Sequence, residues 1–204
     1  MNKLTILGVF AGFLPLMAQP ASSVAPPQIP TLQVCNLDLP SGVGIVSSSG
    51  APQVHIPSRM LGGFTGNVHI TVNAGCDPST GFPVGTVTLN PLSMNDTLSG
   101  LVSISSVHID QITSTGLVNP TAYMSGQCIA QIAAAGGPAV NQPCHFWIMF
   151  VSGTTNSTNN VPGPDIVSFL VFANTATHAG QRIAYATGSV TTGTGTIQVT
   201  PTNN

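Results

Sequence analysis

Two apolar runs in the second half of the chain constrain the fold most. They span residues 144–151 and 166–173 and together hold the only Trp and four of the eight Phe. Each run has the length of a strand, is rich in β-branched and aromatic residues, and is bounded by Gly, Pro or Asn. Apolar side chains occupy both alternating faces of each run, so both faces are predicted to be covered. We therefore expect two paired strands at the centre of a β-domain.

Shorter strand signals lie between turn residues along the rest of the chain. Residues 67–72 alternate apolar and polar side chains, which is typical of a strand with one buried and one solvent-facing side. Residues 98–112 alternate less regularly, and the frame slips near Ser105-Ser106, where we predict a bulge. Further strand signals lie at residues 34–39, 53–56, 84–89, 181–186 and 196–200. Eight or nine short strands predict an all-β fold, an antiparallel β-sandwich that is Ig-like or jelly-roll-like.

One segment interrupts this strand pattern. Within residues 127–135, three apolar side chains share one helical face ahead of a Gly-Gly-Pro stop signal, which predicts a short helix. The run from Tyr123 also fits a strand, so both alternatives stay open. The opposing sheet would cover one face of the central strands, and this helix or a neighbouring subunit would cover the other.

The N-terminal residues have the pattern of an export signal. Lys3 precedes an apolar run, residues 4–18, that is too short and too interrupted by proline for a membrane span, and small residues follow. We predict a secretory signal peptide over residues 1–21, with a retained anchor as the alternative. Residues 22–33 are predicted to form a Pro-rich extended leader. Residues 34–204 would form a single β-sandwich domain, with no integral membrane segment left after signal cleavage.

The chain is almost free of charged side chains, which narrows its partners. It contains 3 Lys and Arg and 5 Asp and Glu, all five of them Asp. Without Lys3, two positive and five negative side chains leave a formal charge of −3. So few cations argue against binding to nucleic acid or to anionic membranes. Two explanations for the low charge stay open. Weak electrostatic repulsion between copies favours association or polymer packing. Alternatively, the protein functions at acidic pH, where carboxylates are neutral and many Lys and Arg residues would leave a large positive charge.

Four cysteines are predicted to form two disulfides, because an even number in an exported chain is typical of disulfide pairing. Of the three possible pairings we favour Cys35–Cys76 and Cys128–Cys144, which close the shorter loops. A tetrathiolate zinc site is the alternative, and the lack of a C-x-x-C pair argues against it. Paired cysteines and a signal peptide together predict that the protein is secreted, on the cell surface or in the periplasm.

Three Val-His-Ile tripeptides provide the candidate metal ligands His55, His69 and His108. In a strand, the Val and Ile of each tripeptide would face the core and the His would face outwards. Neighbouring strands would let the three imidazoles converge and hold copper or zinc. The register that this convergence needs is not determined by the sequence. The alternative is that each His is a solvated polar residue.

Motifs for catalysis are missing from the sequence. It has no G-x-S-x-G elbow, no Glu for paired-carboxylate chemistry, and no Gly-rich nucleotide loop before a helix. Carbohydrate binding usually needs several exposed aromatic side chains, and Trp147, Tyr123 and Tyr185 are the whole supply of Trp and Tyr, which is a small number for such a site. We therefore expect an exported, non-catalytic structural, adhesive or self-assembling β-domain without a cofactor, whose partner is itself or another surface component. A periplasmic or extracellular protein that binds copper or zinc is the alternative, and a hydrolase ranks third.

Overall fold

A computed structural model describes the protein at residues 34–35, 44–57, 65–94, 100–116, 119–133, 137–153 and 163–200. The described residues form strands and connecting turns, and they belong to one compact unit, Thr31–Asn204. The antiparallel all-β fold class is thereby confirmed. The predicted signal peptide (1–21) and the Pro-rich leader (22–33) lie outside the described residues, so both stay predictions. Within the described ranges, no helical segment has the length and hydropathy for a membrane crossing.

The described residues form eleven strands, which outnumber the eight or nine expected. Their bounds are β1 (Val34–Cys35), β2 (Gly44–Gly50), β3 (Gln53–Ile56), β4 (Gly66–Cys76), β5 (Pro83–Met94), β6 (Leu101–Thr115), β7 (Thr121–Ala133), β8 (Ala139–Val151), β9 (Ile166–Ala173), β10 (Arg182–Val190) and β11 (Gly195–Val199). The two central runs of the sequence analysis are the second half of β8 and the whole of β9. They pair over eight residues, from Cys144 opposite Ala173 to Val151 opposite Ile166.

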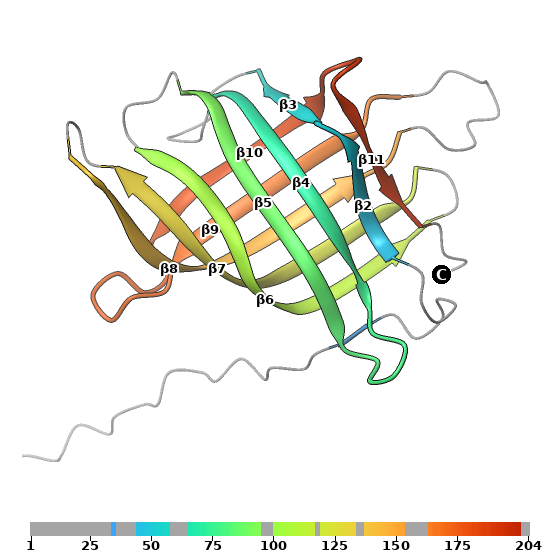
Figure 1. The fold of residues 1–204 in the computed structure, drawn as a ribbon, viewed down its shortest axis with the longest axis horizontal. Helices are drawn as coiled ribbons and strands as arrows, with labels where there is room; N and C mark the ends of the chain where they lie inside the picture. Colours follow the sequence, from blue (N-terminus) through green and yellow to red (C-terminus); the bar gives the residue numbers. More distant parts are fainter. Residues whose placement is uncertain are drawn as a thin grey trace, which may run out of the picture. The chain divides into compact units, whose positions relative to one another are not determined.

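Hydrogen bonds join all eleven strands into one sheet (Figure 1). The strand order is β1-β6-β7-β8-β9-β10-β3-β4-β2-β11, and β5 pairs with both β4 and β6. The pairings therefore form a closed circuit that runs from β6 through β7–β10, β3, β4 and β5 back to β6. Every pair is antiparallel except the short β1–β6 pair. The two surfaces expected of a sandwich thus belong to a single continuous sheet.

The closed circuit encloses one hydrophobic core. In Figure 1, β4 and β5 cross in front of the layer made by β7–β10. The core side chains of the front layer are aliphatic, such as Ile70 and Leu89. Those of the back layer include Phe146 and Phe150, which are fully buried. The alternation of β9 is complete, because every second residue from Val167 to Ala173 is buried. This alternation leaves the other side of the back layer facing solvent.

The predicted helix at residues 127–135 is wrong, because residues 127–133 are the second half of β7. β7 pairs with β8 over thirteen consecutive residues, from Thr121 opposite Val151 to Ala133 opposite Ala139. Ile132 packs against the core, whereas Ile129 lies on the other side of the strand. The shared helical face of these residues was therefore a coincidence of spacing, and long-range pairing with β8 decides the conformation.

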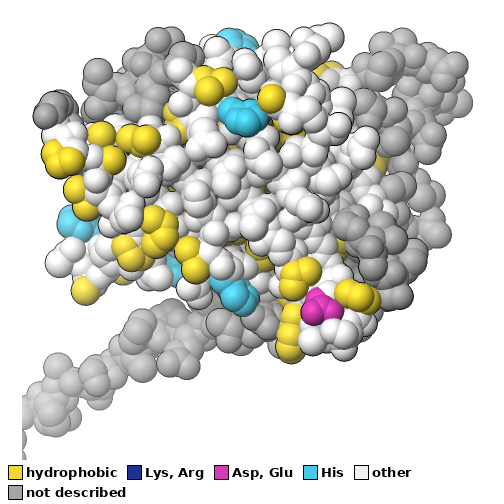
Figure 2. Space-filling view, in the orientation of Figure 1, with side chains coloured by type: hydrophobic (Ala, Val, Ile, Leu, Met, Phe, Trp, Pro, Cys, Tyr) yellow, Lys and Arg dark blue, Asp and Glu magenta, His cyan; other side chains and the backbone are white. Residues whose placement is uncertain are grey.

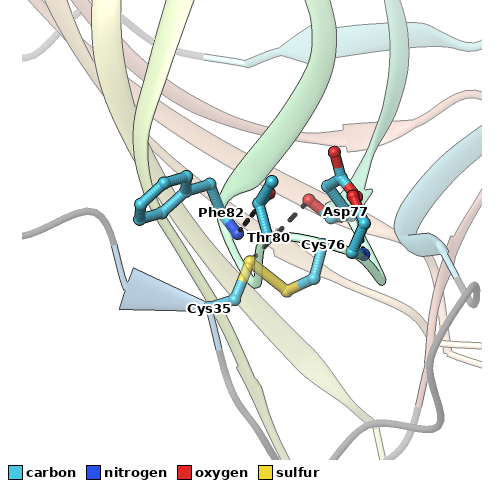
Figure 3. The surroundings of a disulfide bond; sticks show 7 residues. Cys35, Cys76, Asp77, Thr80 and Phe82 are labelled. Atoms are coloured by element: carbon cyan, nitrogen blue, oxygen red, sulfur yellow. Dashed lines mark hydrogen bonds between the residues drawn. A yellow bond between two sulfur atoms is a disulfide. The ribbon is translucent and has the colours of Figure 1, made fainter.

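The favoured disulfide pairing is confirmed: Cys35 bonds Cys76, and Cys128 bonds Cys144. The first bond ties β1 to the end of β4, beside the turn of the β4–β5 hairpin (Figure 3). The second joins directly opposed residues of β7 and β8, whose Cα atoms are 4.8 Å apart. Two disulfides indicate folding in an oxidising compartment. The predicted bulge in β6 is also confirmed, as a register shift between Ser106 and His108.

Candidate functional site

The Val-His-Ile tripeptides follow the expected orientation in two of three cases. His55 on β3 and His69 on β4 lie on the outer side of their strands, between buried Val and Ile residues. The third tripeptide differs, because the bulge in β6 leaves both Val107 and His108 exposed. A bulge shifts the alternation by one residue, so the side of the strand that Val107 faces could not be read from the tripeptide.

The three histidines do not form one group. His55 and His69 are diagonal neighbours, since β3 pairs Gln53 with His69 and His55 with Asn67. Asn90 of β5 pairs with His69, and the register between β5 and β6 puts Ser103 at the same level. His108 lies five residues further along β6, which is about 17 Å at about 3.4 Å per residue. The predicted copper or zinc site of His55, His69 and His108 therefore receives no support from the register.

Each exposed histidine has a polar neighbour of its own instead. The Nδ1 atom of His55 lies 3.0 Å from Oδ1 of Asn67, and that of His108 lies 3.1 Å from Oδ1 of Asp110. Among the described residues, no cluster of three or more His, Cys, Asp or Glu side chains could hold a metal ion. These histidines thus act as individual polar groups on the outside of the sheet.

The outer side of the β7–β10 layer carries all of the Trp and Tyr residues of the chain. Tyr123 comes from β7, Trp147 from β8 and Tyr185 from β10. The side chains of Trp147 and Tyr123 are 57% and 48% exposed. The sequence analysis expected a helix or a neighbouring subunit to pack on this face. Residues 127–133 are part of β7, so no helix formed by them packs there. The sequence named these three aromatics but gave no sign that one face would hold them.

A shallow groove of about 370 Å³ lies on this outer face. We call it the outer groove and define it by seven side chains of two cross-strand rows together with three buried residues between them. The first row is Gln111, Ser125, Trp147 and Leu170, and the second is Tyr123, Met149 and Ser168. The three buried residues are Met124, Ile148 and Phe169. The first row crosses four neighbouring strands, β6 to β9, and the second crosses three, so the groove runs across the strands rather than along them.

The lining of the outer groove is uncharged and mixes apolar with neutral polar groups. Trp147, Leu170 and Met149 supply apolar surface, while Gln111 and the two serines supply amide and hydroxyl groups. Ser168 Oγ lies 2.8 Å from the Thr187 hydroxyl on β10, which orients it. Beside the groove, the guanidinium carbon of Arg182 lies 4.3 Å from the centre of the Tyr185 ring. The groove can therefore offer ring stacking and neutral hydrogen bonds.

The opposite face of the molecule has a different character (Figure 2). Its described surface, over β4 and β5, is mostly neutral and polar, with scattered hydrophobic side chains and histidines and no visible Lys or Arg. The outer groove belongs to the β7–β10 layer, which lies behind β4 and β5 in Figure 1. All of the Trp and Tyr side chains thus lie on the outer side of the β7–β10 layer.

The strands beneath the outer groove are held in a fixed register. The Cys128–Cys144 bond joins β7 to β8 three residues before Trp147. Gly126 lets β6 pass close by, because a Cβ atom there would lie 2.1 Å from the carbonyl oxygen of His108 and 2.9 Å from the Phe146 ring. A platform positioned in this way needs little rearrangement on binding.

Comparison with protein-family models, with curated proteins and with solved structures finds no significant match to this chain. The function is therefore argued from the geometry of the outer groove and from the composition of the chain. Five of the seven lining side chains were not singled out in the sequence: Gln111, Ser125, Met149, Ser168 and Leu170. For Met149, Ser168 and Leu170 the only signal was their position on the second face of the central runs, and Gln111 and Ser125 lie outside those runs.

Proposed function

We propose that this chain is an exported, disulfide-stabilised β-domain that acts without catalysis as an adhesive module and contacts its partner through the outer groove. The observation that carries the proposal is the exposure of Trp147 on an uncharged, grooved surface. Large aromatic side chains are enriched where proteins bind partners, and they are expensive to leave in water. A cluster of them on one face is therefore best explained by a contact that covers it.

Export is supported by three independent features. The N-terminal sequence has the pattern of a secretory signal, the two disulfides suit an oxidising compartment, and the surface depends on Ser, Thr and Asn rather than on charge. A secreted or surface-exposed site of action follows as part of the proposal, with the periplasm as the third location.

The chemistry of the groove supports adhesion over catalysis. Its lining consists of aromatic, aliphatic, amide and hydroxyl groups, which suit shape recognition and neutral hydrogen bonding. Adhesion needs only such contacts, whereas hydrolysis would need a nucleophile beside a base or a pair of carboxylates. The groove side chains would act by stacking on and hydrogen-bonding to the partner.

The test is retention of the purified exported protein on cell-surface material. Labelled protein would be incubated with cell walls and extracellular matrix from several sources, and bound protein would be measured after washing. We expect retention on at least one material and a loss of about tenfold in W147A. V107A serves as the matched control, since Val107 is 66% exposed on β6 but lies outside the groove. Retention that is absent from every material, or equal in W147A and wild type, would overturn the proposal.

Sedimentation velocity over a range of concentrations separates adhesion from self-assembly. We expect the exported protein to stay monomeric while it adheres. Oligomers that form with rising concentration and disappear in W147A would show that a second copy covers the groove. That outcome would replace adhesion with self-assembly as the function of this face.

A further inference from the structure

We propose that the ligand of the outer groove is an unbranched neutral polysaccharide that lies across β6–β9 and stacks on Trp147 and Tyr123. This inference rests on the proposed adhesive function and names its ligand class. It depends on the direction of the groove, on the arrangement of its rings and on its lack of charge.

The shape of the groove fits an elongated ligand. Its lining comes from four neighbouring strands, which span about 14 Å at about 4.8 Å per strand spacing. Along each strand it occupies two outward positions, such as Tyr123 and Ser125, or about 7 Å. The groove is therefore about twice as long as it is wide. An extended chain of sugar rings has these proportions.

The backbone beneath the groove excludes recognition by strand addition. β7, β8 and β9 are each paired on both sides at the level of the groove, as shown by the continuous row Gln111, Ser125, Trp147, Leu170 and Tyr185. A peptide that adds a strand to a sheet needs an unpaired edge. Recognition in the outer groove must therefore use side chains.

The two rings lie in different rows of the groove and one strand apart, so a ligand that crosses the strands obliquely would contact both. Trp147 of β8 is directly opposite Ser125 of β7. Tyr123, two residues before Ser125, is therefore the diagonal neighbour of Trp147, at about 7–8 Å. Sugar rings have apolar C–H faces that pack on aromatic rings and hydroxyl edges that need both donors and acceptors. Gln111, Ser125 and Ser168 provide both kinds of group on either side of the rings.

The electrostatics select a neutral polymer. The lining contains no acidic or basic side chain. The charged groups of a charged polysaccharide would therefore lose hydration on binding without gaining an ion pair in the groove. Arg182, beside the groove, already packs on Tyr185 at 4.3 Å. Protein partners are typically bound with buried Arg and Trp anchors over a larger area. The small size and neutrality of the groove thus favour a glycan.

Affinity electrophoresis in native gels tests the ligand class directly. The exported protein would migrate through gels that contain a soluble neutral polymer (hydroxyethyl cellulose, xyloglucan, glucomannan, a β-1,3-glucan or starch) or the anionic polymer alginate. We expect retardation in at least one neutral gel and none in alginate. We expect a loss of affinity of about tenfold or more in W147A, a smaller loss in Y123A, and none in V107A.

A second variant guards against misfolding. W147F keeps a ring for stacking and should retain part of the binding, and circular dichroism would check that every variant keeps its strand content. Binding that persists in W147A, or that is strongest in alginate and lost with added salt, would overturn the inference. A lack of retardation in every neutral gel would also overturn the inference.

The two proposals fail in distinguishable ways. If cell-surface material retains the protein in a Trp147-dependent manner but no neutral polysaccharide binds, adhesion stands and the glycan inference is overturned. If neither material nor polymer is bound, both proposals are overturned. Retention with Trp147-dependent polysaccharide binding supports both.

Discussion

The carboxylate of Asp165 accepts a hydrogen bond from the backbone N–H of Ile197 at 2.7 Å and another from that of Gly153 at 2.8 Å. The backbone carbonyl of Asp165 accepts a third, from Val190, at 2.8 Å. One buried residue thus connects the end of β8, the end of β10 and the edge strand β11. Because a buried carboxylate must have its hydrogen bonds satisfied, this residue should be essential for closing that end of the domain.

The variant D165N should therefore be destabilised by about 2–4 kcal/mol. The amide has only one oxygen, so its NH₂ group would face one of the two N–H donors, and that donor would lose its partner in the interior. Urea denaturation at neutral pH measures the change. D110N is the matched control, since Asp110 is partly exposed and its carboxylate lies 3.1 Å from Nδ1 of His108 on the outside of the sheet. Equal stabilities of D165N and D110N would contradict this account.

Gly126 should tolerate no larger residue. In G126A the methyl group would meet the carbonyl oxygen of His108 at 2.1 Å, and that oxygen belongs to the backbone of β6. We expect a loss of about 2–3 kcal/mol, typical of overpacking, because the β6–β7 pair must shift. G163A is the control, because a Cβ atom there meets nothing closer than 4.0 Å. Thermal denaturation of the two variants should give clearly different midpoints, and similar midpoints would refute the prediction.

Removal of the two disulfides should cost different amounts of stability. Cys128–Cys144 closes a sequence separation of 16 and Cys35–Cys76 one of 41. Loop entropy then predicts a loss of about 3 kcal/mol for the first bond and about 4 kcal/mol for the second. Double Cys→Ala variants, compared by urea denaturation, measure both losses. A larger loss from the shorter loop would show that local packing outweighs the entropy of the unfolded chain.

The pKa of the Asp77 carboxyl, in the turn between β4 and β5, should lie below the usual range of aspartate. The Ser79 hydroxyl and backbone N–H both donate to Oδ1 of Asp77, and these bonds lower the pKa of that carboxyl. The turn therefore gains stability above the pKa of the unfolded chain and loses it as the pH falls through the lower native value, in a window below about pH 4. In S79A the pKa of Asp77 should rise, and in S79T it should stay low. An NMR titration of the Asp77 carboxyl carbon measures it, and an unchanged value in S79A would exclude the hydroxyl as the main cause.

Metal content should not depend on the Val-His-Ile histidines. The register separates His108 from His55 and His69, so the three imidazoles cannot share one ion without unpairing β5 from β6. We expect the same copper and zinc content in purified protein and in the variant H55A/H69A/H108A. Elemental analysis after dialysis makes the comparison. A stoichiometric metal that disappears in the variant would restore the metal-binding alternative.

Local alternation predicted the strands that have one buried side, and it did so reliably. β3 and the first part of β4 were expected because every second side chain is apolar. β9 was expected from its apolar, β-branched and aromatic composition, without alternation in the sequence. β2 was missed as a full strand, since Ser47, Ser48 and Ser49 have little preference for a sheet and are held there by pairing with β11. The helical spacing within residues 127–133 is also a local pattern. Pairing with β8, which lies further along the chain, decides their conformation instead.

The candidate site was harder to predict than the fold. Tyr123 and Trp147 are separated by 24 positions in the chain, and they become neighbours only through the register of β7 with β8. Such a register follows from turn geometry and from the core, neither of which a single sequence specifies. The three histidines lie apart because the register places His108 about 17 Å further along β6, and the tripeptides carry no information on that register.

The closed circuit of strands limits the unpaired strand edges of a protein that has few charged side chains. Most proteins keep apart through like charge, and here that repulsion is weak. Unpaired strand edges are the usual route to clumping, yet along the circuit of β3–β10 each strand has a partner on either side. Colloidal stability would then come from topology, and mutations that open the short β10–β3 or β5–β6 joints should cause precipitation before they cause unfolding.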